Sequence, residues 1–392
     1  MAGLTAALRL TQADHEVTVL EARDRVGGRV HSIKLGNGEV AELGGEWISS
    51  DQRWVVELAR ELEVPMSEVG VDFAKRDLIG SPPIAASEHI RVAGVVADAI
   101  ESLSVVDRSS LTVDVLLEGL DDGSDAFTIL RQRVEASAGV SAEQVGVEEI
   151  VGDFGIAEAT YLRIDGGNQL LAVAVANQLF DLRTDQPVRS VESDDTGVKV
   201  TTQSDRILAD GVIVAVPLPL ISRLRFIPPL STEITSVLDR LMMGTAAKFA
   251  VSTESLPPLL ARQDGSETWW CWTGAGSDGK SRKIVTAFAG TQSAVDTLSG
   301  GWRDRITAAL PEVKFGADSV TVDWGNEEWS GGCYSALGPG DEVLLGVFEE
   351  EGPVVFAGEH TLGAGTIDGA IESGVQAGNR LGTFLARATA SN

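Results

Sequence analysis

The chain has 392 residues, with 31 Lys and Arg against 58 Asp and Glu, and so carries a formal net charge of −27. Such an acidic chain is poorly suited to nucleic acid or to an anionic membrane surface, and neither is expected as a partner. A negative field would attract small cationic molecules, although an acidic surface also simply keeps a protein soluble. The length allows about two domains, at ~100–200 residues per domain.

The cysteine content and the two ends of the chain indicate a compartment. Two cysteines, Cys271 and Cys333, are too few for a disulfide framework and suit a reducing environment. No apolar run is long enough to span a bilayer, and the N-terminal segment, with Arg9 and Asp14, is not typical of a signal peptide. We therefore expect a cytoplasmic protein with no membrane tail. No metal site is predicted, and a homodimer is left open.

The first motif in the chain is a dinucleotide-binding pattern. Residues 3–10 are small and apolar and predict a crossing helix, and residues 17–20 predict a strand that ends at Glu21. A carboxylate there can accept both hydroxyls of an adenosine ribose, and Gly27-Gly28-Arg29 can meet a pyrophosphate. The alternative is a solvated glutamate, but its offset after Gly3 fits the fingerprint. The first strand and its Gly-x-Gly are expected upstream of Met1.

The next elements alternate between helices and strands. Residues 51–64 predict a helix with apolar Val55, Leu58 and Leu62 on one face. From 71 to 163 the pattern is mostly helical, with loops at 81–83 and 121–123. Strands are predicted at 198–202 and at 211–216, the latter stopped by Pro217.

A second inserted stretch, residues 238–326, contains the run Trp269-Trp270-Cys271-Trp272. These tryptophans could form a wall of a site, but we interpret them as core. A final strand is predicted at 354–356, followed by a small-residue helix at 366–381.

Seven short segments together resemble one family, the flavin-containing amine oxidases, which comprise the monoamine oxidases and their bacterial relatives. The matching segments are 21–29, 43–47 (Leu-Gly-Gly-Glu-Trp), 165–167, 215–217, 243–248, 330–334 (Ser-Gly-Gly-Cys-Tyr) and 356–361. They follow the family order over nearly the whole chain. Many flavoproteins share the first segment, whereas Lys248 with Cys333 and Tyr334 narrows the resemblance to amine oxidases.

The resemblance implies an α/β fold in which a Rossmann-like FAD-binding domain is interleaved with a mixed sheet and helical (α+β) substrate domain. Residues 1–70, 164–237 and 327–392 are expected in the FAD-binding domain, and residues 71–163 and 238–326 in the substrate domain. The implied reaction is FAD-dependent oxidation of an amine to an imine, which hydrolyses to an aldehyde or ketone, with O2 reduced to hydrogen peroxide.

The resemblance also assigns residues to the cofactor. Gly44-Gly45 could be an ordinary turn, but with Glu46-Trp47 it matches the family segment beside the flavin. Near Thr366 a helix begins, whose amides could face the pyrimidine edge of a reduced flavin. The predicted cofactor-binding residues are Gly3, Glu21, Arg23, Gly28, Arg29, Gly44, Gly45, Glu46, Val188, Cys333, Gly358, Glu359, Thr366 and Ile367.

Two residues are predicted to be catalytic, Lys248 and Tyr334. Most lysines lie on the surface, but Lys248 sits in an apolar strand, where a charge needs a reason. In the amine oxidases the lysine at this position holds a water against the flavin N5. Tyr334 matches one of two caging tyrosines, and the second position falls at Thr366, so half of the cage is absent. Cys333 either carries FAD through a thioether or packs as a small hydrophobe.

Two other functions are compatible with parts of the sequence. A flavin desaturase or protoporphyrinogen-oxidase-like enzyme shares the nucleotide motifs but generally lacks the Lys248 and Cys333-Tyr334 signatures. A catalytically inactive fold that no longer holds FAD is the other alternative. Flavin absorbance and peroxide release on amine addition separate the three.

Overall fold

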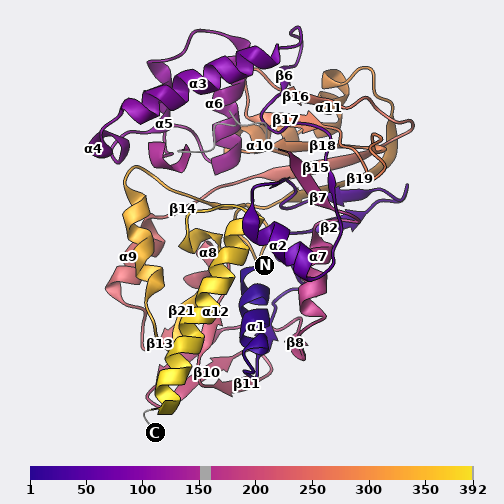
Figure 1. The fold of residues 1–392 in the computed structure, drawn as a ribbon. Helices are drawn as coiled ribbons and strands as arrows, with labels where there is room; N and C mark the ends of the chain where they lie inside the picture. Colours follow the sequence, from indigo (N-terminus) through magenta and orange to yellow (C-terminus); the bar gives the residue numbers. More distant parts are fainter. Residues whose placement is uncertain (151–159, 391–392) are drawn as a thin grey trace.

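The computed structural model describes residues 1–150 and 160–390. Figure 1 shows an upper half built on a large sheet with helices around it, and a lower half with two long neighbouring helices and shorter strands. Both ends of the sequence contribute to the lower half, where α1 (Ala2–Gln12) lies beside α12 (Ile367–Ala390). The chain therefore passes between the halves several times, as an interleaved fold requires.

The upper sheet has the strand order β19–β15–β18–β17–β16–β6 and is antiparallel except between β16 and β6. In that order the strands are Phe315–Asp323, Ala247–Thr253, Ile284–Ala289, Trp269–Trp272, Ala261–Gln263 and Asp77–Leu78. Alternate residues of β15, β17 and β18 form a core with α10 (Gln292–Ser299) and α11 (Trp302–Ala309). Because side chains alternate along a strand, Lys248 and Trp270 lie on the opposite face.

Four helices lie beside this sheet, and three of them, α3 (Ala86–Ser102), α5 (Val113–Glu118) and α6 (Asp125–Ala138), share a second apolar core with residues of the segment that follows them. The remaining one is α4 (Val105–Arg108). The hydroxyls of Ser104, Thr112 and Ser124 accept backbone N–H groups and cap α4, α5 and α6. The mostly helical stretch predicted from 71 to 163 is confirmed, with strands β6 and β7 (Tyr161–Ile164) near its ends. Residues 151–159 of that stretch lie outside the described residues.

In the lower half, two separate pairs of parallel strands flank a large cavity. β1 (Thr18–Leu20) pairs with β8 (Asp181–Arg183), and β12 (Val212–Val214) pairs with β21 (Val354–Phe356). Side chains of β1 and β12 both line the cavity between the pairs. The predicted strands at 17–20, 211–216 and 354–356 are confirmed, each within a residue or two of its bounds.

The remaining elements include a further sheet in the lower half. A sheet of order β11–β10–β9–β13 comprises Arg206–Ala209, Gly197–Thr201, Ser190–Asp194 and Arg225–Ile227. The other helices are α2 (Arg53–Glu61), α7 (Gln169–Ala176), α8 (Leu218–Ile221) and α9 (Thr232–Arg240), with 3₁₀ turns at Val147–Ile150, Asp341–Glu349 and Glu359–Thr361. The other strands are β2 (Ser32–Lys34), β3 (Val40–Glu42), β4 (Ile48–Ser49), β5 (Met66–Glu68), β14 (Met242–Met243) and β20 (Ser335–Ala336).

Two predicted helices differ in length from those observed. The helix predicted over 51–64 is α2, which is shorter and ends before Leu62, and the helix predicted over 366–381 continues in α12 to Ala390. In α2, Val55 and Leu58 are buried as the periodicity indicated. Across residues 1–150 and 160–390, no helix combines the length and the apolar character needed to cross a membrane.

Candidate active site

One cavity of about 1520 Å³ extends from the parallel strands to the inner face of the upper sheet. It is larger than an ordinary small-molecule pocket of ~300–1,000 Å³ and has room for a dinucleotide with a substrate. All the predicted site residues line it, although they are scattered over the sequence. These are Gly3, Glu21, Arg23, Gly28, Arg29, Gly44, Gly45, Glu46, Val188, Lys248, Cys333, Tyr334, Gly358, Glu359, Thr366 and Ile367.

At the strand end of the cavity, Glu21 and Arg23 have partners within the protein. A Glu21 side-chain oxygen accepts the backbone N–H of Arg23 at 2.9 Å, which fixes the carboxylate just after β1. The Arg23 guanidinium pairs with Glu327 and donates to Ser330 Oγ at 2.9 Å. Glu327 and Ser330 were not predicted, because nothing local in the sequence links them to residue 23.

Glycines clear space for a ligand along the cavity wall. Gly27 and Gly28 have φ values of +103° and +59°, a region that side chains rarely adopt. At Gly44 an added Cβ would lie 1.8 Å from the carbonyl oxygen of Arg29, so two backbone segments touch there. Such a cradle, with a carboxylate at the strand end, fits an adenine dinucleotide such as FAD.

Arg29 and the buried Glu359 form an ion pair beside the cavity. Arg29 Nη1 donates to Glu359 Oε1 at 2.8 Å and to the carbonyl of Cys333 at 2.7 Å. Ser335 Oγ donates to the same carboxylate at 2.7 Å. Burial alone would raise the pKa of Glu359, but Arg29, His360 and Ser335 together outweigh it and the pKa lies below the ordinary value. Glu359 is therefore an ionised carboxylate held in one orientation.

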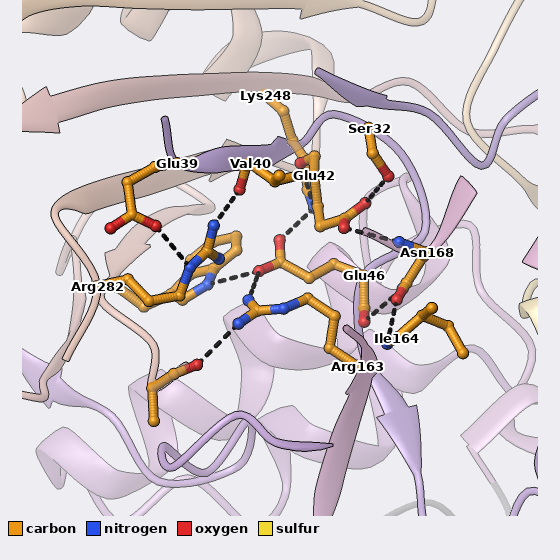
Figure 2. A network of polar contacts seen from close by, with 12 residues as sticks. Ser32, Glu39, Val40, Glu42, Glu46, Arg163, Ile164, Asn168, Lys248 and Arg282 are labelled. Atoms are coloured by element: carbon orange, nitrogen blue, oxygen red, sulfur yellow. Dashed lines mark hydrogen bonds and ion pairs between the residues drawn. The ribbon is translucent and has the colours of Figure 1, made fainter. Parts of the chain in front are cut away.

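Lys248 is fully engaged in a network of polar contacts (Figure 2). Its side chain is only 6% exposed, and Nζ donates to the carbonyls of Glu42 and Gly44 at 3.2 and 2.9 Å and to Glu46 Oε2 at 2.8 Å. A lysine ammonium has three N–H donors, so these acceptors use all of them. A charge in this apolar strand was expected to need a partner, and Glu46 is that partner.

The Glu46 carboxylate connects Lys248 to Trp272 and Arg163, and the Glu46 backbone carbonyl has a partner of its own. Glu46 Oε1 accepts from Trp272 Nε1 at 3.3 Å and lies 3.6 Å from Arg163 Nη1, while Asn168 Nδ2 donates to the Glu46 carbonyl at 2.9 Å. Burial alone would raise the pKa of Glu46, but Lys248 and Arg163 outweigh it and the pKa lies below the ordinary value. The carboxylate is thus ionised among cations.

An aromatic wall faces the same part of the cavity. Trp270 and Trp272 are stacked with centroids 4.0 Å apart, and Trp47 lies 5.6 Å from each of them. Phe73 and Tyr161 complete the wall, with centroids 5.6 and 5.5 Å from Trp47.

The interpretation of the tryptophan run as core is correct, because Trp269 packs with α10 and α11 and Trp270 and Trp272 are also buried, but the last two line the cavity as well. The alternation of side chains along β17 explains the split and was the signal available in the sequence. Phe73 was missed because it lies in an irregular segment, and Tyr161 because it begins the short strand β7, which was not predicted.

The two positions that correspond to the caging tyrosines, Tyr334 and Thr366, also line the cavity. Tyr334 lines the cavity, and its hydroxyl donates to the carbonyl of Ala136 at the end of α6. Burial raises its pKa well above the ordinary value, so the hydroxyl stays protonated. Thr366 lines the cavity just before α12 and accepts the Gly369 N–H at 2.9 Å, which caps that helix. Ile367 is the first residue of α12, as predicted.

The ion pairs of the two buried glutamates predict acid lability. Unfolded glutamates titrate near 4.5, whereas Glu46 and Glu359 keep lower pKa values in the folded chain. The unfolded state therefore binds more protons in acid, and the stability from these pairs is fully present above about pH 4.5 and is lost as pH falls through the folded-state values. Urea unfolding from pH 7 to 3.5 should show this loss, and Glu46→Gln should make it shallower.

The pH experiment has a matched control, and it must also account for Glu42, whose effect on stability has the opposite sign. Glu57, in an exposed pair with Arg53, is a matched control, and Glu57→Gln should leave the curve unchanged. Burial, followed by the nearby Glu46, raises the pKa of Glu42, so this residue costs stability as pH rises above 4.5. A Glu46→Gln curve that parallels the wild-type curve would contradict the assignment.

The fold and the cradle define a flavoprotein of the dinucleotide-binding type, and comparisons with known proteins place it further. The family model described as flavin containing amine oxidoreductase matches residues 1–381. The chain belongs to this family, whose cofactor is FAD. Across residues 1–150 and 160–390, no group of three or more His, Cys, Asp or Glu could hold a metal ion.

Individual relatives agree with this assignment. The chain is 25% identical to a nicotine dehydrogenase of Pseudomonas putida over 98% of this chain and 87% of that protein. It is 29% identical to a putrescine oxidase of Kocuria rosea over 58% and 57% of the two chains. A solved structure of wild-type putrescine oxidase bound to putrescine superimposes with a TM-score of 0.82 at 22% identity, over 97% of each chain. The predicted two-domain α/β fold is confirmed.

Proposed function

We propose that this protein oxidises an amine to an imine with bound FAD, and that O2 is the acceptor and leaves as hydrogen peroxide. The observation that carries the proposal is that one cavity brings together the nucleotide cradle, Lys248 with Glu46, and an aromatic wall. We assign residues 1–70, 164–237 and 327–392 to FAD binding, and residues 71–163 and 238–326 to the substrate.

FAD, when bound, would accept the hydride equivalent from the carbon next to the amine nitrogen. The residues of this chain would hold and orient both molecules. Gly27, Gly28 and Gly44 would admit the dinucleotide, and Glu21 would bind its ribose. Trp270 and Trp272 would cover the reacting carbon and exclude water.

The protonation states of the two glutamates at the cavity suit a neutral amine. Glu46 and Glu359 are ionised but committed to Lys248 and Arg29, so neither is free to remove a proton. A neutral amine needs no such base for loss of hydride. The aromatic wall favours an amine with an apolar or ring-shaped body, because flat apolar groups stack well on indole.

The acceptor is the part of the proposal that needs the first experiment, since the nicotine relative is named a dehydrogenase. The FAD-loaded chain is offered a panel of amines twice, under air with detection of hydrogen peroxide, and without O2 in the presence of an artificial electron acceptor. Peroxide release at turnover supports the proposal. Bleaching of the flavin by an amine with turnover only on the artificial acceptor would make the protein a dehydrogenase, and no bleaching by any amine would favour the desaturase alternative.

We expect FAD to bind without a covalent bond to Cys333. Its Sγ packs against Gly139, and burial raises the pKa of the thiol to about 12, so little thiolate is present to attack the flavin ring. Acid precipitation of the yellow protein should release FAD into the supernatant. Colour that stays with the pellet, and is lost from it in Cys333→Ser, would instead establish the thioether.

A further inference from the structure

The strongest feature that the reaction does not yet explain is the charge of the Lys248–Glu46 pair. Both side chains are buried, at 6% and 3% exposure, and their charged atoms are 2.8 Å apart. At this separation the two charges nearly cancel for any group farther away. The cavity wall therefore carries a compensated ammonium rather than a free one.

The neighbouring charges form a constant background around the pair, to which Arg163 adds one positive charge. Arg163 lies 3.6 Å from Glu46 and also donates to the carbonyl of Ala275, while Arg282 is paired with Glu39 at 3.0 Å. The Glu42 carboxyl accepts from Ser32 Oγ and from the Asn168 N–H. Figure 2 shows these groups around Glu46. They are unaltered in variants of residues 46 and 248, so such variants change only the charge of the pair.

We propose that Glu46 is a positioning residue that sets how fast the reduced enzyme reacts with O2, by cancelling the charge of Lys248 at the cavity wall. The proposal rests on the proposed function in so far as FAD occupies this cavity. In reoxidation, reduced FAD loses two electrons and two protons to O2, which becomes hydrogen peroxide. The first electron produces superoxide, an anion, which a nearby cation stabilises and a nearby carboxylate destabilises.

The charge argument predicts an order among four proteins. The pair has a charge of zero in the wild type, +1 in Glu46→Gln, −1 in Lys248→Met, and zero again in the double variant. Reoxidation should be fastest in Glu46→Gln, equal in the wild type and the double variant, and slowest in Lys248→Met. Each step should be on the order of tenfold for one unit charge in a partly buried setting.

The test uses the FAD-loaded full chain, reduced photochemically without O2 and mixed with O2 in a stopped-flow instrument. Photochemical reduction needs no amine. A yellow protein that oxidises no amine would therefore contradict the proposed function while the reoxidation order is still measured. A protein that binds no FAD overturns both.

Two outcomes would overturn the inference alone. If Glu46→Gln reacts no faster than the wild type, the charge of Glu46 does not govern reoxidation. If the double variant is as slow as Lys248→Met, Lys248 acts through a specific hydrogen bond and not through charge. Should Glu46→Gln fail to fold, the wild type, Lys248→Met and the double variant still give this decision.

Denaturant unfolding supplies a readout that is independent of the flavin reaction. In each single variant one buried charge loses its partner in the Lys248–Glu46 pair, whereas the double variant contains neither of the two charges. The double variant should therefore unfold at a higher urea midpoint than Lys248→Met. A lower midpoint would show that the two side chains are not coupled, and that the geometric basis of the inference is wrong.

Discussion

Lys248→Met is expected to keep FAD bound and to slow each half-reaction, reduction by amine and reoxidation by O2, by on the order of tenfold. Methionine conserves the volume of the lysine stem in the buried strand. The exchange removes an ammonium that donates three hydrogen bonds and leaves the Glu46 carboxylate on the cavity wall. An uncompensated carboxylate disfavours the negative charge that a reduced flavin gains.

The measurement separates the two half-reactions by stopped-flow absorbance. Lys199 lies in strand β10 and pairs with Glu192 of β9, which makes it a matched control. Lys199→Met should leave both rates unchanged. If Lys248→Met reproduces both wild-type rates, Lys248 is a structural residue that only joins Gly44 and Glu46 to the upper sheet.

The predicted site residues could be picked out from the sequence because each motif is local, and the structure places them along one cavity. Gly27-Gly28-Arg29 follows its strand directly, and Gly44-Gly45 precedes Glu46 within one turn. Such segments carry their chemistry in a few consecutive residues. Their convergence on one cavity, over more than three hundred residues of sequence, came from the family resemblance and not from any periodicity.

The contacts that set the charge of the site could not be predicted. Glu46 meets Lys248 from β15, Trp272 from β17 and Arg163 from β7, and these pairings depend on how distant strands are placed. A single sequence shows that a buried lysine needs a partner, but it does not show which acidic residue supplies it. The same limit applies to Arg23, whose partner Glu327 lies near the other end of the chain.

Gly44→Ala is expected to abolish FAD binding and to destabilise the fold by several kcal/mol, out of a total of ~5–15 kcal/mol. The new Cβ would lie 1.8 Å from the carbonyl oxygen of Arg29 and 2.8 Å from its carbon, so backbone must move on one side or the other. The movement would break the hydrogen bond from the Gly45 N–H to the Arg29 carbonyl. It would also displace the Gly44 carbonyl that accepts from Lys248.

Gly94→Ala is the matched control, because nothing lies within 4 Å of a Cβ at this position in α3. There the extra methyl should raise stability by ~0.5–1 kcal/mol, since alanine is the better helix former. Urea unfolding and FAD titration of both variants give the comparison. Because Gly44 joins the cradle, the Arg29 backbone and Lys248, its variant should lose the flavin and the fold together. A yellow Gly44→Ala protein with wild-type stability would show that neither the fold nor FAD binding requires the close backbone contact between Gly44 and Arg29.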